Sequence, residues 1–195
     1  MLNAFQKDAQ RWVIPSRIAD PSEITLLKTL KLLWAYPPLQ AMLLFRAGQW
    51  CRRKHIPAIP GMCQRLITLF YGLEITIGAD IGGGLYIPHP VGMVIAPERI
   101  GEYCSIISSV TIGMRNEWKF PRIGSHVFIG AGARVLGDVE IGDGAQIGAN
   151  AVVIHDIPAG ATAVGIPAKV VRAASPQSEA GLEPEKEPEH AAVAA

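Results

Sequence analysis

The sequence predicts a mainly β protein, in which a parallel β-helix follows a short N-terminal α-helical region. Three observations lead to this fold class. Aliphatic residues recur every six positions in the middle of the chain, the residues before that stretch have helical spacing, and the residues after it have few apolar side chains. We therefore expect three zones, at residues 1–73, 74–172 and 173–195.

The first zone, residues 1–73, has the spacing of short helices. In one stretch the apolar residues recur every three or four positions: Ile24, Leu27, Leu30 and Trp34. Two further helical stretches cover residues 39–53 and 62–71. The segments "YPP" and "IPAIPG" separate the three stretches, because a proline inside a helix removes a backbone hydrogen bond and clashes with the preceding turn. We expect the helices to be interrupted at these two segments.

The second zone carries the repeat that decides the fold class. Its aliphatic residues follow a six-residue period: Ile75, Ile81, Ile87, Ile100, Ile106, Ile112, Ile123, Ile129, Val135, Ile141, Ile147 and Val153. A small or β-branched residue often follows four positions later, for example Ala79, Val91 and Ala151. Two inward positions in every six residues fit a coil with three flat sides, so residues eighteen positions apart should stack.

The repeat is interrupted twice, and the chain ends in a different composition. One extra residue lies between Ile87 and Ile100, and "GMRNEWKFPR" separates Ile112 from Ile123. In a solenoid such insertions become surface loops, often on the functional face. Residues 173–195 are rich in Pro, Glu and Ala, so burial of apolar surface there would not offset the entropy of ordering. We expect a disordered tail.

Composition excludes several classes of function. The formal net charge is +1 and no basic stripe alternates with aromatic residues, so we expect no nucleic-acid partner. Three cysteines without CxxC spacing, Cys51, Cys63 and Cys104, argue against a disulfide framework and against a structural zinc site. We expect reduced thiols and no bound metal.

The N-terminal residues do not look like a targeting segment. "MLNAFQKDAQRW" has charged residues where a secretory signal has its apolar core, and Lys28, Lys31 and the pair Pro37-Pro38 interrupt the most apolar region. We therefore expect a cytoplasmic protein. A weak membrane-surface contact of the N-terminal helices, through the basic residues 52–55, stays open.

From Glu74 to Arg172 the sequence resembles the serine acetyltransferase branch of the hexapeptide acyltransferases. The matching segments are "EITIGADIGGGLYIPHPVGMVI", "SVTIG" and "IGAGARVLGDVEIGDGAQIGANAVVIHDIPAGATAVGIPAKVV". The resemblance implies a left-handed β-helix, acetyl-CoA as the co-substrate, and a homotrimer whose cofactor groove lies between subunits. It implies an O-acetyltransferase that acts on an acceptor hydroxyl, which is that of L-serine in the parent family.

The resemblance also assigns the catalytic pair. His89 falls on the family's catalytic histidine, the general base that takes the proton of the acceptor hydroxyl. Glu74 falls on the family's acidic partner, normally Asp, which orients the imidazole. A histidine suits the role of general base, because a neutral imidazole with an ordinary pKa of about 6.5 accepts a proton at physiological pH. Without the resemblance, His89 between two prolines would be a turn residue and Glu74 a cap on the first coil.

Five further residues are candidates for binding. Ala131 and Ala149 match family positions that line the pantetheine arm of coenzyme A, and they lie one coil apart. Lys169, in "PAK", is a candidate for a phosphate at the nucleotide end. Lys119 and Trp118, in the second insertion, are candidates for acceptor binding. Lys119 stands where the family has an Arg.

Two departures from the family concern the acceptor. The family usually has an Asp before the catalytic histidine, where this chain has Pro88, and a second histidine where this chain has Phe120. Both residues help to hold an amino acid. The segments "LLFRAGQWCRRKH" and "YGLEI" look more like acetyltransferases of cell-surface polysaccharide synthesis. A saccharide hydroxyl is therefore the alternative acceptor.

Other readings of the repeat are weaker. A γ-class carbonic anhydrase on the same prism needs a closely spaced pair of zinc histidines, which the chain lacks. A non-catalytic scaffold would need neither an alanine groove nor a loop that breaks the register. The last residues, "AAVAA", lack the C-terminal isoleucine by which the family binds the next enzyme of cysteine synthesis, so we expect no cysteine synthase complex.

Overall fold

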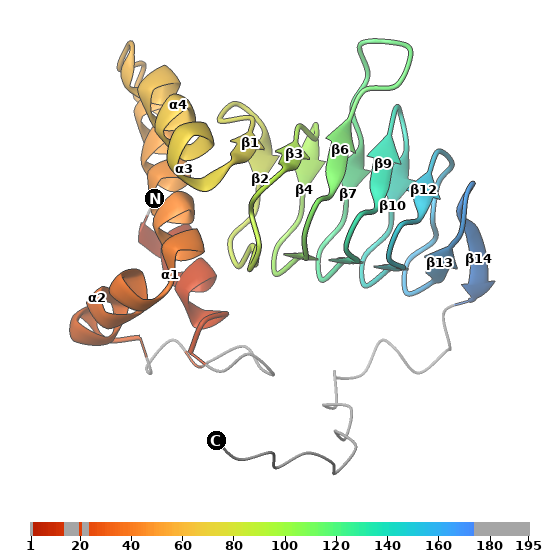
Figure 1. The fold of residues 1–195 in the computed structure, drawn as a ribbon, viewed down its shortest axis with the longest axis horizontal. Coiled ribbons are helices and arrows are strands. Elements are labelled where there is room, and N and C mark those ends of the chain that lie inside the picture. The colour runs from red at the N-terminus through yellow and green to blue at the C-terminus, as the bar shows by residue number, and fades with distance from the viewer. Residues whose placement is uncertain (1, 14–19, 21–23, 174–195) are drawn as a thin grey trace.

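The computed structural model describes residues 2–13, 20 and 24–173, and in this part of the chain four helices precede a stack of short strands (Figure 1). The helices are α1 (Leu2–Gln10), α2 (Leu26–Ala35), α3 (Pro37–Arg53) and α4 (Ile59–Tyr71). The predicted order of a helical region before a repeating β region is confirmed. Apart from Ala173, the tail predicted for residues 173–195 lies outside the described residues.

The strands are two to four residues long. They are β1 (Leu73–Ile75), β2 (Asp80–Ile81), β3 (Met93–Ile95), β4 (Arg99–Ile100), β5 (Ser105–Ile106), β6 (Thr111–Gly113), β7 (Arg122–Ile123), β8 (Phe128–Ile129), β9 (Arg134–Leu136), β10 (Glu140–Ile141), β11 (Gln146–Ile147), β12 (Val152–Val153), β13 (Thr162–Val164) and β14 (Lys169–Arg172).

Proline and glycine mark the helix boundaries. α2 ends at Ala35 and α3 begins at Pro37, so the prolines of "YPP" occupy the first turn of α3, where the missing N–H costs no hydrogen bond. The Thr25 hydroxyl oxygen caps α2 by accepting a hydrogen bond from the Lys28 N–H (3.3 Å). α4 ends at Gly72, whose φ of +61° lies in the left-handed region that favours glycine. Gly72 turns the chain directly into β1.

The β region is a solenoid with three flat sides. Its sheets have the strand orders β1-β3-β6-β9-β12, β10-β7-β4-β2 and β14-β13-β11-β8-β5. From β1 to β13, strands that follow one another in the chain belong to different sheets, so each coil places strands on successive sides. All the paired strands are parallel except β13 and β14, which are antiparallel at the end of the third sheet. The predicted mainly β fold with a parallel β-helix is confirmed.

Stacking follows the predicted eighteen-residue spacing in the regular coils. Ile123 pairs with Ile141, eighteen positions later. Ile112 pairs instead with Val135, because the inserted residues 114–121 leave the coil as a loop and the strands on either side of the loop keep their places. Figure 1 shows this loop between β6 and β7, projecting from the solenoid.

The aliphatic residues of the repeat fill the inside of the solenoid, as predicted, and all of them are at most 3% exposed. One of the smaller positions was predicted wrongly. Val91 is 71% exposed, and Met93, at 1%, points into the core instead. The reason is the extra residue in this repeat, which the turn after Pro90 accommodates with Gly92 at a φ of +74°. The turn carries Val91 out of the coil.

A buried ion pair joins the helical region to the solenoid. The Arg46 Nε donates to Asp8 Oδ2 (2.8 Å) and the Arg46 Nη2 donates to Asp8 Oδ1 (3.0 Å). Asp8 Oδ1 also accepts hydrogen bonds from the backbone N–H groups of Gly84 (2.8 Å) and Leu85 (2.9 Å). Burial raises the pKa of Asp8, and the Arg46 guanidinium opposes that shift. Asp8 thus ties α1 and α3 to the first coil.

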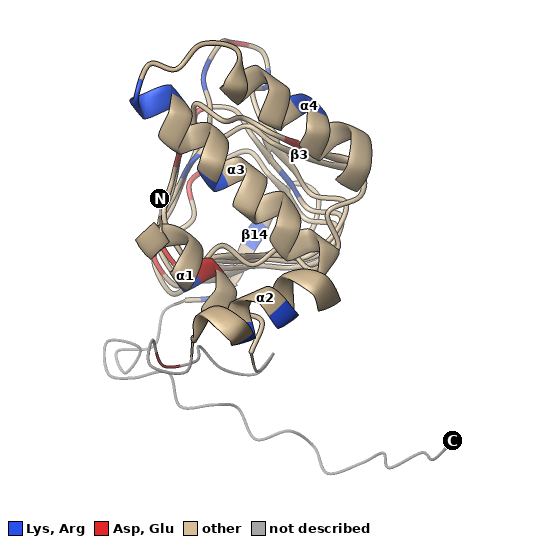
Figure 2. Ribbon diagram, turned by 90° about the vertical axis from the view of Figure 1, so that its left-hand side faces the viewer, with Lys and Arg blue, Asp and Glu red and all other residues tan. Residues whose placement is uncertain are grey.

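The same guanidinium satisfies carbonyl groups at the open end of the solenoid. Arg46 Nη1 donates to Ile81 O (2.7 Å) and Nη2 donates to Gly82 O (2.6 Å), while Gln49 Nε2 donates to Ala79 O (3.0 Å). In Figure 2, which looks at this end, the helices lie across the coils. The helical region therefore covers the end of the solenoid and satisfies buried polar groups of its first coil.

No helix among the described residues combines the length and the apolar character needed to cross a membrane.

Candidate active site

One edge of the solenoid carries three of the predicted site residues in a row. His89 forms a parallel bridge with Ser108 on the next coil. Ser108 O accepts a hydrogen bond from the N–H of Gly132 (2.8 Å), and Ala131 O accepts one from the N–H of Asn150 (2.8 Å). The residues His89, Ser108, Ala131 and Ala149 therefore follow one another from coil to coil, and we call this row the His89 edge.

The backbone holds His89 in a fixed place on this edge. Pro88 and Pro90 flank it, and each proline restricts its own φ and the conformation of the residue before it. Pro90 is buried, whereas the His89 side chain is exposed. A histidine on a rigid turn and open to solvent can meet a substrate without a change in the fold.

The alanines of the His89 edge have short side chains, so little projects from the surface of this edge. Ala149 is exposed and Ala131 is half-buried. The coils are so close there that a Cβ at Gly130 would lie 2.7 Å from the Ala149 backbone nitrogen. With neighbouring strands about 4.8 Å apart, the three coil steps from His89 to Ala149 cover about 14 Å. The edge can therefore accept an extended, narrow molecule whose reacting end lies at His89.

Lys169 lies at the C-terminal end of the same edge. The turn before it is attached to the start of β12, because Val152 N–H donates to Gly165 O (3.0 Å) and Ala168 N–H donates to Val152 O (2.8 Å). Lys169 begins β14 and is exposed. A cation at this end can pair with an anionic group at the far end of a molecule that lies along the edge.

Glu74 lies on β1, in register with Val94 of β3, and its side chain is exposed. The turn that follows His89 contacts the start of this strand, since the Gly92 N–H donates to Gly72 O (2.9 Å). Within the described residues, no hydrogen bond joins the Glu74 carboxylate to the His89 imidazole. The structure brings the two segments together but does not show the predicted carboxylate–imidazole contact.

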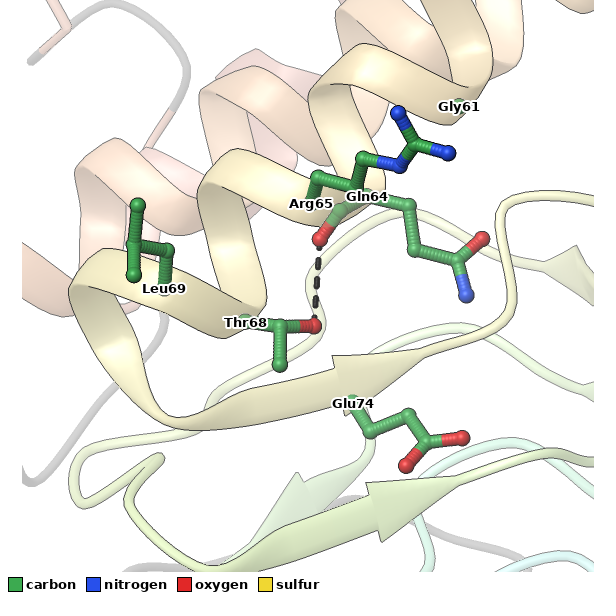
Figure 3. A pocket seen from close by; sticks show the side chains of 6 residues that line it. All are labelled: Gly61, Gln64, Arg65, Thr68, Leu69 and Glu74. Atoms are coloured by element: carbon green, nitrogen blue, oxygen red, sulfur yellow. Dashed lines mark hydrogen bonds between the residues drawn. The ribbon is translucent and has the colours of Figure 1, made fainter.

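A cavity of about 600 Å³ lies beside Glu74, between α4 and β1 (Figure 3). Figure 3 shows the Gln64 side chain reaching from α4 toward β1, and Arg65 is the cationic residue of the lining. The single proton of the Thr68 hydroxyl is shared between Gln64 O (3.1 Å) and Leu73 O (3.2 Å), which holds the end of α4 against the strand. The lining consists of Gly61, Gln64, Arg65, Thr68, Leu69 and Glu74.

The sequence did not identify Gln64 and Arg65, because no motif marks them. They become neighbours of Glu74 only through the packing of α4 on β1. Ser108 was missed as well, although the stacking rule could have found it, since it follows His89 by about one coil length.

Trp118 and Lys119 lie on the loop between β6 and β7. Trp118 is 80% exposed and packs edge-on against Phe120, with ring centroids 5.5 Å apart. The Lys119 Nζ pairs with Glu117 Oε2 (3.1 Å) and lies 3.6 Å from Asp138 Oδ2. The hydrogen bond and charge of Glu117, together with Asp138, raise the pKa of Lys119. The contact with Asp138 joins the loop to the following coil, whereas the pair with Glu117 lies within the loop.

The loop and the His89 edge lie at opposite ends of the same strands. The loop leaves the solenoid after β6, whereas the Ser108 segment of the His89 edge precedes β6. One chain therefore does not bring Trp118 and Lys119 to His89. Among the described residues, no group of three or more His, Cys, Asp and Glu side chains is placed to hold a metal ion.

Comparisons with known proteins agree with this architecture. A family model described as "Bacterial transferase hexapeptide (six repeats)" matches residues 120–155. The serine acetyltransferase of Synechococcus elongatus is 39% identical over 146 residues, which are 73% of this chain and 60% of that protein. The serine acetyltransferase of Helicobacter pylori strain J99 is 39% identical over 145 residues, which are 72% of this chain and 85% of that protein.

Solved structures give the same result. A serine acetyltransferase in complex with CoA superposes with a TM-score of 0.73 at 30% identity, over 87% of this chain and 69% of that one. A soybean serine acetyltransferase complexed with serine has a TM-score of 0.71 at 32% identity, over 87% of this chain and 73% of that one. The likeness in sequence and fold confirms the predicted family and, with it, the left-handed β-helix and the acyltransferase class. This chain belongs to the serine acetyltransferase family.

Proposed function

We propose that this protein transfers the acetyl group of acetyl-CoA to a hydroxyl group, and that L-serine is the acceptor, as the names of its relatives state for them. The observation that carries the proposal is the His89 edge, where an exposed histidine and two small residues lie in one line. Structures of relatives in complex with CoA and with serine support both substrates. The chain spans only 60% of the Synechococcus relative, so the activity is proposed from this part of the fold.

His89 is the general base in this reaction. Its neutral imidazole takes the proton of the acceptor hydroxyl while the hydroxyl oxygen attacks the thioester carbon. The tetrahedral intermediate then collapses, the carbon–sulfur bond breaks, and the imidazolium returns the proton to the leaving CoA thiolate. An oxygen ester and free CoA result, and His89 is neutral again. Glu74 is a positioning residue, whose carboxylate orients the imidazole and stabilises its cationic form.

Acetyl-CoA lies along the His89 edge. Its thioester is at His89, its pantetheine arm passes Ala131 and Ala149, and a phosphate of its nucleotide end pairs with Lys169. Side chains larger than alanine would project into this path, which is why the small residues matter. The position of Lys169 after the last coil supports this direction of binding. Of the three residues proposed to bind acetyl-CoA, Lys169 is the charged one and lies farthest from His89.

The active form is a homotrimer in which a second subunit completes each site. Trp118 and Lys119 lie on the opposite side of the β6 strand from the His89 edge of the same chain, so they reach a His89 only in another subunit. Packing three prisms around an axis would place one subunit's loop beside the next subunit's edge. The two residues then contact the acceptor, Trp118 by its ring and Lys119 by its charge.

A saccharide hydroxyl is the second candidate for the acceptor. Pro88 offers no carboxylate for an amino group, and Phe120 packs on Trp118 where the family has a polar histidine. Aromatic rings present a flat apolar face of the kind that packs on a sugar ring. The cavity beside Glu74 adds the Gln64 amide and the Arg65 guanidinium, which donate hydrogen bonds to hydroxyl or carboxylate groups alike.

An acceptor panel tests the proposal. Purified protein is mixed with acetyl-CoA and offered L-serine, simple sugars or sugar nucleotides, and the release of CoA is followed with a thiol reagent. We expect CoA release above the rate of hydrolysis with L-serine. A faster reaction with a sugar would select the second candidate, and no release with any acceptor would contradict acetyl transfer to a hydroxyl.

A further inference from the structure

α2 exposes an apolar face that the described residues, 2–13, 20 and 24–173, do not cover. Leu26, Leu30 and Trp34 are four residues apart, so they lie on one side of the helix, and they are 78%, 54% and 88% exposed. Leu27, beside them, is also exposed. Leu32 is the buried residue of α2, and the helix contacts α3. A surface helix normally turns its apolar side inward, so this face requires a partner of its own.

The helices around this face are basic. Residues 24–73 contain no Asp or Glu, and their cations are Lys28, Lys31, Arg46, Arg52, Arg53, Lys54 and Arg65. Figure 2 shows Lys and Arg but no acidic residue on α2, α3 and α4. Asp8 neutralises Arg46 in the interior. Within the described part of the chain, no ion pair involves Lys28 or Lys31. This end of the molecule is therefore positive, although the net charge of the chain is only +1.

We propose that α2 docks on the surface of a membrane that contains anionic lipids. Leu26, Leu30 and Trp34 would enter the boundary between headgroups and acyl chains, and Trp34 is of a residue type that favours this depth. Lys31 is exposed at the margin of the apolar face, whereas Lys28 is half-buried and lies about 160° around the helix from Leu30. The long side chain of Lys31 can reach anionic headgroups while its methylene groups stay in the apolar layer, and Lys28 adds positive charge to the same helix. Apolar burial and charge thus act together.

A second copy of this chain and a nucleic acid are the two other occupants considered for this face, and both fit it less well. A symmetric contact through this face with a second copy would bring the Lys31 side chains of both copies close together, and residues 24–73 supply no carboxylate to neutralise them. A nucleic acid would neutralise the lysines but would leave Leu26 and Leu30 without an apolar partner. Only a surface that is both apolar and anionic matches both features of α2.

Co-sedimentation with vesicles tests this proposal on the full-length protein. We expect binding to vesicles of phosphatidylcholine mixed with phosphatidylglycerol, at least about tenfold weaker binding to phosphatidylcholine alone, and weaker binding at high salt. The double substitutions Leu30→Ser/Trp34→Ser and Lys28→Gln/Lys31→Gln should each lower the partition coefficient about tenfold or more. Acetyl transfer in solution should not change, because α2 lies outside the proposed site.

Matched controls come from the solenoid. Val171→Ser removes an apolar side chain that is 63% exposed, and Arg99→Gln removes an exposed cation. Neither should alter vesicle binding. Absence of binding to the anionic vesicles overturns the proposal. Binding that depends on the lysines but not on Leu30 and Trp34 also overturns it, because that result would indicate a polyanion site. A larger mass by light scattering that only the α2 variants reduce overturns it as well, because that result would indicate contact with a second copy.

Discussion

The Arg46 guanidinium and the Asp8 carboxylate form a buried ion pair, with Nε 2.8 Å from Oδ2, and their side chains are 2% and 0% exposed. The pair links two helices to each other, and its further hydrogen bonds reach the first coil of the solenoid. Each partner would be a costly buried charge without the other. The attachment of the helical region to the β-helix therefore depends on both residues.

Breaking this pair should destabilise the protein strongly. Arg46→Met leaves the Asp8 carboxylate buried without its cation, and we expect the free energy of unfolding to fall by about 3–5 kcal/mol in urea denaturation at fixed protein concentration. The double variant Asp8→Asn/Arg46→Met should lose less than the sum of the single variants. Arg99→Met, which removes an exposed and loosely paired cation, is the control. Equal losses in Arg46→Met and Arg99→Met would contradict this account.

Cys104 should make the stability depend on pH in the alkaline range. Burial raises the pKa of its thiol to about 11, from an ordinary value of 9.0. Between these values the unfolded chain loses the proton and the folded protein keeps it, so stability falls as pH rises through this window. From pH 8 to pH 10.5 the loss is about 2 kcal/mol.

The matched variant isolates this effect from the titration of lysines and tyrosines. Cys104→Ala should be less stable than the unmodified protein at pH 8, because it loses packing and the Sγ contact to Gly124 O (3.1 Å). The difference in unfolding free energy between the two proteins should shrink by about 2 kcal/mol at pH 10.5. A difference that stays constant with pH would show that the thiol titrates alike in both states.

Filling the alanine positions should weaken binding of acetyl-CoA. Ala149→Leu places a branched side chain on the His89 edge, and we expect the KM for acetyl-CoA to rise by about tenfold or more while the protein keeps its fold. Ala159→Leu changes another exposed alanine, on a different corner of the solenoid, and serves as the control. If both variants have the same KM, acetyl-CoA does not pass Ala149.

Mixed trimers test whether two subunits build each site. His89→Ala and Trp118→Ala/Lys119→Ala should each have low activity alone. In randomly mixed trimers about one site in four combines an intact His89 with an intact loop, so activity should return to about a quarter of the unmodified level. Mixing His89→Ala with His89→Asn should restore nothing. No recovery in the first mixture would contradict the shared site. It would mean either that one chain supplies both His89 and the loop to a site, or that Trp118 and Lys119 lie outside the site.

Much of the solenoid is predictable because its physical signal is periodic. In each repeat the aliphatic residue occupies the position that points into the solenoid. The buried positions from Ile75 to Val153 could therefore be predicted from the sequence. Val91 could not, because one extra residue in its repeat moves the side chain to the other side of the backbone. The break in the period was visible, but its structural accommodation at Gly92 was not.

The contacts between the two regions were not predictable. Asp8 and Arg46 are 38 positions apart, and neither lies in a motif that marks it as buried. Gln64 and Arg65 likewise become neighbours of Glu74 only when α4 packs on β1. His89 and its alanines were found because they lie inside the repeat and match a known family. The orientation of Glu74 toward His89 was expected from that family, and the single chain does not show it.

The central claim, that His89 is the base for acetyl transfer, is tested most directly by one steady-state measurement. CoA release from acetyl-CoA and the best acceptor is compared for the unmodified protein, His89→Ala and His155→Ala, which removes an exposed histidine away from the His89 edge. We predict that kcat falls about 10²–10⁴-fold in His89→Ala and stays unchanged in His155→Ala, with the same circular dichroism spectrum for all three. A folded His89→Ala variant with unchanged kcat would contradict the account.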